Sequence, residues 1–133
     1  MPITIVVADD DADYRLLVRL ILATVSHTMA VIGEAVDGEE ALELVQRDRR
    51  PDIVISDLLM PRLNGIELTR RVKDQQPQTN VILLSAYTGE AYRRVAAASG
   101  ADAFVSKRLI HSDLVPAIRD VIVRRVSEPV PSR

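Results

Sequence analysis

Several short apolar runs of this sequence end in residues that can do chemistry. These residues, each at the close of such a run, are Asp9, Asp10, Asp57, Ser85 and Lys107. A carboxylate at the end of a buried strand costs free energy unless something compensates it. Carboxylates that lie close together also repel one another unless a cation lies among them, and hard oxygen ligands suit Mg²⁺. This pattern favours a magnesium site.

The same residues could carry out phosphoryl chemistry. Mg²⁺ usually binds through carboxylates together with phosphate oxygens, so a phosphoryl group would lie beside the metal. The carboxylate of Asp57 could be the nucleophile that forms an acyl phosphate. Lys107 would then neutralise phosphoryl oxygens, and the Ser85 hydroxyl would donate to one of them. Each residue alone has an ordinary explanation, and their occurrence at successive run ends favours the chemical one.

The elements that must position these residues follow from hydrophobic periodicity. Apolar runs typical of buried strands occupy residues 3–8, 29–36, 52–56, 80–86 and 102–106. Amphipathic stretches predict helices over residues 14–25, 39–47, 65–75 and 89–100, and a last helix that starts at Ser112 or Asp113, with Pro116 in its first turn. Strands that alternate with helices imply a parallel sheet covered on both faces. The carboxyl ends of its strands are where a site forms.

Helix caps account for further acidic residues. Asp11 and Asp13 are both placed to cap the first helix, and Asp37 is placed to cap the second. We therefore assign these three residues to local structure rather than to the chemical site.

Composition narrows the class of protein. The 133 residues are 47% hydrophobic and 27% charged, which fits one domain with a real core. The formal net charge of -2 gives no basic field for nucleic acid, and the absence of Cys excludes disulfides and thiolate sites. We expect a cytoplasmic protein with no nucleic-acid or membrane partner. Residues 1–126 form the predicted domain, and the Pro- and Ser-rich residues 127–133 read as a tail or the start of a linker.

Four segments of the chain resemble the receiver domain of bacterial two-component response regulators, most closely the NarL/FixJ type. They are "VVADDDADYR", "PDIVISDLLMPRLNGIEL", "VILLSAY" and "GADAFVSK". The resemblance implies an α/β, flavodoxin-like (βα)5 fold, a doubly wound five-stranded parallel sheet in the order 2-1-3-4-5. It also implies that a sensor histidine kinase phosphorylates Asp57, which switches partner binding or a phosphorylation-dependent homodimer. Control of transcription would then need an output domain outside this chain.

Carried over by position, the resemblance assigns the residues that bind metal and phosphoryl group. The implied Mg²⁺ ligands are Asp9, Asp10, Asp57 and the backbone carbonyl of Leu59. Asp57 is the implied phosphoacceptor, and Lys107 pairs with the phosphoryl group. Such a domain catalyses only its own phosphorylation and dephosphorylation, so it is not expected to be an enzyme that acts on a separate substrate.

The resemblance also assigns switch residues and residues that flank the site. Ser85 and Phe104 are the implied switch pair, and Leu59, Ala86 and Tyr87 flank the phosphoryl group. Phe104 stands where the family often has Tyr. Arg108 stands where it commonly has Pro, often after a cis peptide bond. A cis bond before a residue other than proline costs about 2.5–4 kcal/mol, so we expect Lys107–Arg108 to be trans.

Other classes of function compete with this interpretation. A Mg²⁺-dependent phosphatase of the haloacid-dehalogenase kind also uses an Asp nucleophile, and Asp9-x-Asp11 could mimic its motif, although the chain is short for a cap domain. A pseudo-receiver that binds partners without taking phosphate is a second alternative. A flavodoxin-like nucleotide-binding protein is disfavoured because no Gly-rich loop follows the first strand.

Overall fold

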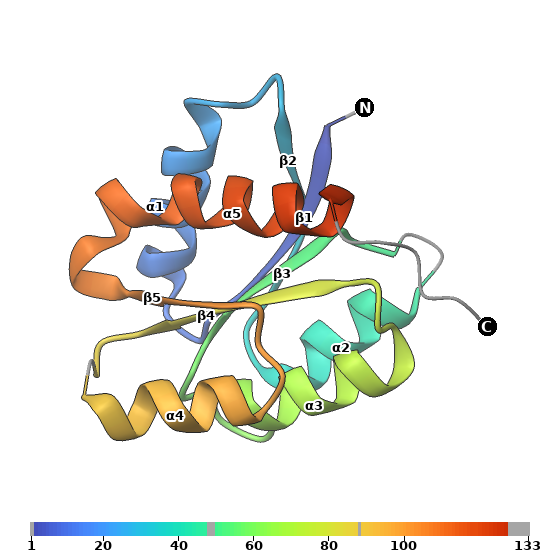
Figure 1. Ribbon diagram of the computed structural model, residues 1–133, viewed down its shortest axis with the longest axis vertical. Coiled ribbons are helices and arrows are strands. Elements are labelled where there is room, and N and C mark those ends of the chain that lie inside the picture. The colour runs from blue at the N-terminus through green and yellow to red at the C-terminus, as the bar shows by residue number, and fades with distance from the viewer. Residues whose placement is uncertain (1, 48–49, 88, 128–133) are drawn as a thin grey trace.

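The alternation of apolar and amphipathic segments folds as five strand–helix units (Figure 1). The computed structural model describes residues 2–47, 50–87 and 89–127. The strands are β1 (Ile3–Ala8), β2 (Met29–Ala35), β3 (Ile53–Asp57), β4 (Asn80–Ser85) and β5 (Ala103–Ser106). The helices are α1 (Ala12–Ala23), α2 (Gly38–Gln46), α3 (Gly65–Gln75), α4 (Glu90–Ala98) and α5 (Ile110–Ser127), and a single 3₁₀ turn, η1 (Lys107–Leu109), precedes α5.

The strands form one parallel sheet in the order β2-β1-β3-β4-β5. This confirms the predicted doubly wound, flavodoxin-like fold. The register places Ala8 beside Ser56 and Asp57 beside Leu84. The residues that close β1, β3 and β4 therefore lie at one edge of the sheet.

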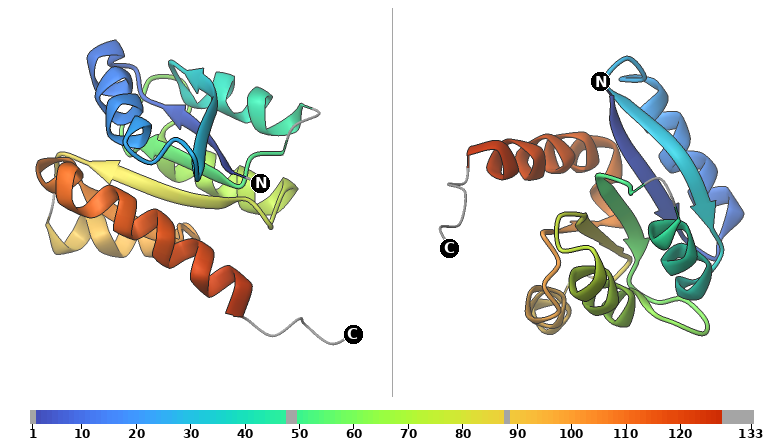
Figure 2. Two further views of the ribbon diagram at one scale, coloured as in Figure 1. Left: turned by 90° about the horizontal axis from the view of Figure 1, so that it is seen from above. Right: turned by 90° about the vertical axis from the view of Figure 1, so that its right-hand side faces the viewer.

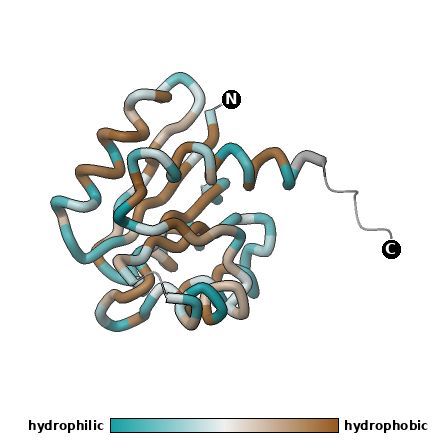
Figure 3. The backbone as a smooth tube through the Cα atoms, turned by 60° about the vertical axis from the view of Figure 1, so that its left-hand side comes forward, coloured by the Kyte–Doolittle hydropathy of each residue, from teal (hydrophilic) through white to brown (hydrophobic). Residues whose placement is uncertain are grey.

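Helices cover both faces of the sheet, as Figures 1 and 2 show from three directions. One core cluster joins the sheet to α1 and α5, and the other joins it to α2, α3 and α4. Because both faces are covered, the central strands are apolar along almost their whole length. Figure 3 shows these hydrophobic segments running through the middle of the molecule, with hydrophilic segments around them. In Figure 2 the last turns of α5 extend beyond the sheet.

The predicted caps of the first two helices are confirmed in part. The Asp11 carboxylate caps α1 by accepting from the backbone N–H groups of Asp13 and Tyr14, and Asp37 caps α2. Asp13 is not a cap, because it lies inside the first turn of α1. A carboxylate there still interacts favourably with the helix dipole.

The predicted start of the last helix is wrong. The Ser106 hydroxyl accepts from the backbone N–H of Arg108 and opens the 3₁₀ turn, which leads directly into α5 at Ile110. Ile110 is buried, so the apolar face of the helix begins before Ser112. Pro116 consequently lies in the interior of α5 rather than in its first turn. Because proline has no backbone N–H, the Ser112 carbonyl receives no helical hydrogen bond from residue 116.

The end of α5 bears on the predicted tail, and the described helices bear on the expected absence of a membrane partner. Ser127 is still helical, and residues 128–133 of the predicted tail lie outside the described residues. Among the described helices, none combines the length and apolar character that crossing a membrane requires.

Candidate functional site

Three predicted acidic residues meet at the carboxyl edge of the sheet. One carboxylate oxygen from each of Asp9, Asp10 and Asp57 lies within 4.8 Å of the other two. β1 and β3 are neighbours in the sheet, so the residues that end or follow them come together although they lie far apart in sequence. Three carboxylates at this spacing repel one another, and hard oxygen donors are the ligands that Mg²⁺ prefers. The donor set therefore fits a divalent cation.

Lys107 reaches this acidic group from the end of β5. Its Nζ lies 2.9 Å from Oδ2 of Asp9 and 3.3 Å from Oδ2 of Asp57. The Asp9 side chain is only 2% exposed, and that of Asp57 only 14%. One ammonium cannot neutralise three carboxylates, so the cluster keeps a net negative charge for a metal ion to balance.

The loop after β3 holds Asp57 in place. The backbone N–H of Leu58 donates to the Leu84 carbonyl over 2.8 Å, and that of Gly65 donates to the Leu58 carbonyl over 2.9 Å. A Cβ atom at Gly65 would collide with the Asp57 carbonyl oxygen. Gly65 is therefore required by the close approach of α3 to the residue that the site is built around.

The protonation of Asp57 reflects competing neighbours. Burial raises the pKa of its carboxyl above the ordinary value, and the Asp9 carboxylate raises it as well. The Lys107 ammonium and the backbone N–H of Leu59 lower this pKa, but the balance is upward. Without a metal ion, the ionised form of Asp57 is thus held at a cost to the folded state.

This cost predicts how Asp57→Asn affects stability. A carboxyl whose pKa is higher in the folded than in the unfolded state favours folding at low pH and loses that contribution as pH rises through its folded pKa. Without divalent metal, we therefore expect Asp57→Asn to raise the free energy of unfolding at neutral pH. The gain should vanish on acidification, and urea unfolding at several pH values measures it. An equal gain at every pH would contradict the role assigned to ionisation.

The implied switch residues lie on neighbouring strands: Ser85 ends β4, and Phe104 lies in β5. Ser85 is buried, and its Oγ accepts from the backbone N–H of Tyr87 over 2.9 Å. Phe104, which pairs with Leu83 in the sheet, is partly buried against the core that α2, α3 and α4 cover. The Arg93 guanidinium lies over its ring, 5.1 Å from the centroid. The role of Phe104 as a switch residue stays a prediction.

The implied flanking residues are exposed. Leu59 and Tyr87 are 51% and 52% exposed, and Ala86 is exposed as well. The Tyr87 ring stacks on that of Tyr92, with 5.1 Å between centroids and 20° between planes. This stacking restrains a large apolar surface in the loop that follows Ser85.

Sequence reasoning missed two residues in the first turn of α1. The helical periodicity over residues 14–25 indicates no role for Tyr14 beyond packing, but its ring lies under the Lys107 ammonium, 4.0 Å from Nζ. Burial raises the pKa of Tyr14 to about 12, with help from the charges of Asp9 and Asp57. Arg15 donates to the backbone carbonyl of Asp9 over 2.7 Å and pairs with Glu34 over 3.2 Å. Two signals could have found them: both residues are close in sequence to the acidic run, and both belong to the segment "VVADDDADYR" that resembles receiver domains.

The loop after β5 adopts the peptide geometry expected from its sequence. No described residue follows a cis peptide bond, so the predicted trans Lys107–Arg108 bond is confirmed. The Ser106 hydroxyl and the 3₁₀ turn shape this loop in the absence of proline.

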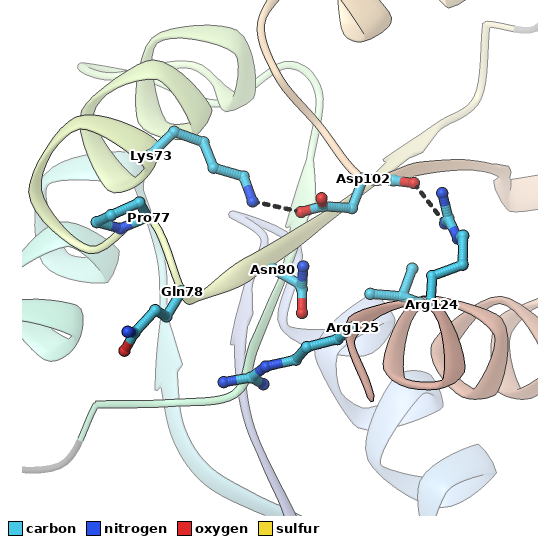
Figure 4. Close-up of a pocket in the computed structure, with 8 residues that line it drawn as sticks. Lys73, Pro77, Gln78, Asn80, Asp102, Arg124 and Arg125 are labelled. Carbon is cyan, nitrogen blue, oxygen red and sulfur yellow. Dashed lines mark hydrogen bonds and ion pairs between the residues drawn. The ribbon is translucent and has the colours of Figure 1, made fainter. Parts of the chain in front are cut away.

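A pocket of about 410 Å³, or hollow, lies at the edge of the sheet opposite to the acidic cluster (Figure 4). Its cations are already paired: Lys73 with Asp102, and Arg125 with Asp52, while Arg124 donates to the Asp102 carbonyl. Among the described residues, no group donates to the buried Oδ1 of Asn80, which lies in this hollow. Paired cations leave little attraction for an anion, so we assign no function to this hollow.

Comparison with known proteins agrees with the geometry at the acidic edge. The response regulator receiver domain family matches residues 5–119. The chain belongs to this family. Response regulator protein VraR of Staphylococcus saprophyticus is 36% identical to this receiver over 121 residues, which are 90% of this chain and 56% of that protein. Transcriptional regulatory protein DegU of Brevibacillus brevis is 34% identical over 119 residues, 90% of this chain and 50% of that protein.

Solved receivers have the same fold. The signal receiver domain of the response regulator NarL from Mycobacterium tuberculosis superposes with a TM-score of 0.80 at 30% identity, covering 96% of this chain and 98% of that one. A LuxR-family response regulator from Aurantimonas superposes with a TM-score of 0.84 at 31% identity, covering 92% and 86%. These likenesses confirm the predicted NarL-type receiver and leave the phosphatase alternative without support. The receiver spans about half the length of the curated relatives it matches.

Proposed function

We propose that this receiver accepts a phosphoryl group on Asp57 from a sensor histidine kinase, with Mg²⁺ as cofactor. The observation that carries the proposal is the convergence of Asp9, Asp10 and Lys107 on the Asp57 carboxylate. A pseudo-receiver would not need this arrangement. The metal ligands would be the three carboxylates and the backbone carbonyl of Leu59.

The transfer itself requires little covalent chemistry from the protein. A carboxylate oxygen of Asp57 forms a bond to phosphorus while the bond from phosphorus to the kinase imidazole nitrogen breaks, and that nitrogen keeps the electron pair. Lys107 neutralises charge on the phosphoryl oxygens, and the Ser85 hydroxyl turns to donate to one of them. A bound Mg²⁺ supplies further charge neutralisation and orientation. The remaining contribution of the protein is to position Asp57, Ser85 and Lys107 at the ends of their strands.

The function of the whole protein extends this proposal. Its relatives include proteins named as transcriptional regulators, so we propose that phosphorylation of this receiver controls transcription through an output domain. The receiver itself would bind a kinase and a second copy or partner, but neither nucleic acid nor membrane. The cytoplasmic location expected from the sequence stays a prediction.

The stoichiometry of labelling tests the proposed function. Incubation with a small acyl phosphate and Mg²⁺ should add one phosphoryl group per chain, measured by intact-protein mass. A chain that takes no phosphoryl group would be a pseudo-receiver. Sustained multiple turnover of a phosphomonoester, without a labelled chain, would instead indicate a phosphatase.

Ser85→Ala should separate phosphorylation from its consequences. The phosphoryl group would draw the Ser85 hydroxyl away from the Tyr87 N–H by a charge-assisted hydrogen bond, and space for Phe104 would open behind it. Without the hydroxyl, Asp57 should still be labelled, but the phosphorylation-dependent change in self-association or partner binding should weaken. Sedimentation of both proteins with and without beryllofluoride measures this. A parent-like response of the variant would place the coupling elsewhere.

The exposed side chains beside the site should lengthen the life of the acyl phosphate. Neither Leu59 nor Tyr87 offers a carboxylate or amide to orient an attacking water, and both can exclude it. The double variant Leu59→Asn, Tyr87→Glu should lose phosphate several-fold faster, as followed by mass after the donor is removed. Leu20→Asn changes a similarly exposed leucine on α1 and should leave the decay unchanged. An unaltered decay in the double variant would contradict shielding.

A further inference from the structure

The side chain of Tyr14 contacts Lys107 at two points. Its ring centroid lies 4.0 Å from Nζ, and its hydroxyl donates to the Lys107 backbone carbonyl over 3.3 Å. Tyr14 stands in the first turn of α1, and Lys107 opens the turn after β5. The contact thus joins the first turn of α1 to the turn that follows β5.

The other partners of the Lys107 ammonium change during the reaction. Nζ pairs with Asp9 and Asp57, which are the proposed metal ligand and phosphoacceptor. A metal ion competes for the Asp9 carboxylate, and phosphorylation converts the Asp57 carboxylate into an acyl phosphate. The ring of Tyr14 bears no formal charge and does not bind Mg²⁺. The ring can therefore stay in contact with the ammonium while Asp9 binds the metal ion and Asp57 carries the phosphoryl group.

Burial strengthens this contact. The Lys107 side chain is only 16% exposed, and attraction between a cation and an aromatic ring grows as water is excluded. The next residue, Arg15, donates to the backbone carbonyl of Asp9 over 2.7 Å. The first turn of α1 therefore holds both members of the Asp9–Lys107 ion pair, one by its side chain and the other by its backbone.

We propose that Tyr14 is a positioning residue for phosphoryl transfer, whose ring keeps the Lys107 ammonium over the Asp57 carboxylate while the hydroxyl anchors the Lys107 backbone. This inference rests on the proposed function of Asp57 as acceptor. Tyr14 itself contacts neither the incoming phosphoryl group nor the metal ion in this role. It acts through Lys107.

A graded set of variants tests the proposal. Tyr14→Leu removes both ring and hydroxyl, and Tyr14→Phe keeps the ring alone. Initial rates of labelling are measured against the concentration of a small acyl phosphate at saturating Mg²⁺. We expect Tyr14→Leu to lower the maximal labelling rate about three- to tenfold, with Mg²⁺ affinity unchanged. The maximal labelling rate of Tyr14→Phe should lie within about twofold of that of the parent. A Phe variant as slow as the Leu variant would overturn the role of the ring.

A matched variant separates positioning from loss of packing. Leu17 lies one turn further along α1 and packs on the same core as Tyr14. Leu17→Ala should lower the unfolding midpoint and leave the maximal labelling rate at the parent value. If it slowed labelling as much as Tyr14→Leu, the effect would be structural and the proposal would fall.

A spectroscopic signature reports the contact directly. In the NMR spectrum of the parent, the ring current of Tyr14 should shift the Lys107 ε-methylene protons upfield. The shift should persist in Tyr14→Phe and after addition of Mg²⁺ and beryllofluoride, and it should vanish in Tyr14→Leu. Its disappearance from the parent on that addition would refute the proposal. A parent that takes no label would defeat the proposed function instead, whereas equal rates for the parent and Tyr14→Leu would defeat only this inference.

Discussion

Replacing Asp57 by Asn is expected to abolish labelling by a small phosphodonor. The amide cannot act as the nucleophile. Asp9, the other carboxylate that contacts Lys107, has a side chain that is only 2% exposed, and its second oxygen accepts from the backbone N–H of Asp11, so it is not free to replace Asp57. The loss should be complete, to the background of the mass measurement. Retained one-to-one labelling of Asp57→Asn would end the assignment of this residue as acceptor.

A matched control protects this experiment from indirect effects. Asp11 lies at the same edge of the sheet and caps α1 through its carboxylate. Asn is as good a helix cap as Asp, so Asp11→Asn removes one negative charge without disturbing the helix. We expect this variant to be labelled as fully as the parent.

Replacing Asp10 by Ala is expected to weaken Mg²⁺ binding strongly. Asp10 is exposed, so its loss should leave the fold intact, whereas Asp9 is buried and accepts from the backbone N–H of Asp11. Changes that only support a ligand already cost about 10- to 100-fold in metal affinity. The loss of a direct ligand should therefore cost at least about tenfold, measured by calorimetric titration with Mg²⁺.

The control for this titration is Asp13→Ala. Asp13 is an exposed carboxylate in the first turn of α1, outside the acidic cluster. Its removal should leave the titration curve close to that of the parent. A parent-like curve for Asp10→Ala would show that this residue is not a ligand.

The metal dependence of stability follows from the same charges. Mg²⁺ that binds the folded state alone raises the free energy of unfolding, and the gain grows with the logarithm of the Mg²⁺ concentration once this exceeds the dissociation constant. The parent should gain this stabilisation, and Asp10→Ala should lose most of it at the same Mg²⁺ concentration. Thermal unfolding with and without Mg²⁺ therefore checks the calorimetric result independently.

Local sequence determined the architecture and the main site. Alternating apolar and amphipathic runs imply strand–helix units, and the chain geometry of such units makes the sheet parallel. In a parallel sheet all carboxyl ends lie at one edge, so Asp9, Asp57, Ser85 and Lys107 could be placed together before any distance was known. Resemblance to a family then assigned each residue a role.

Tertiary structure alone decided the contacts between distant segments. Tyr14 and Lys107 are 93 residues apart, and their contact depends on how α1 crosses the twisted sheet, which periodicity does not encode. The start of α5 likewise followed from burial of Ile110 and from the turn opened by Ser106, which outweighed the local cap signal at Ser112. Sequence patterns report which residues face the core, because that depends on near neighbours. Which side chains meet across the site depends on packing between elements, and only the folded chain specifies it.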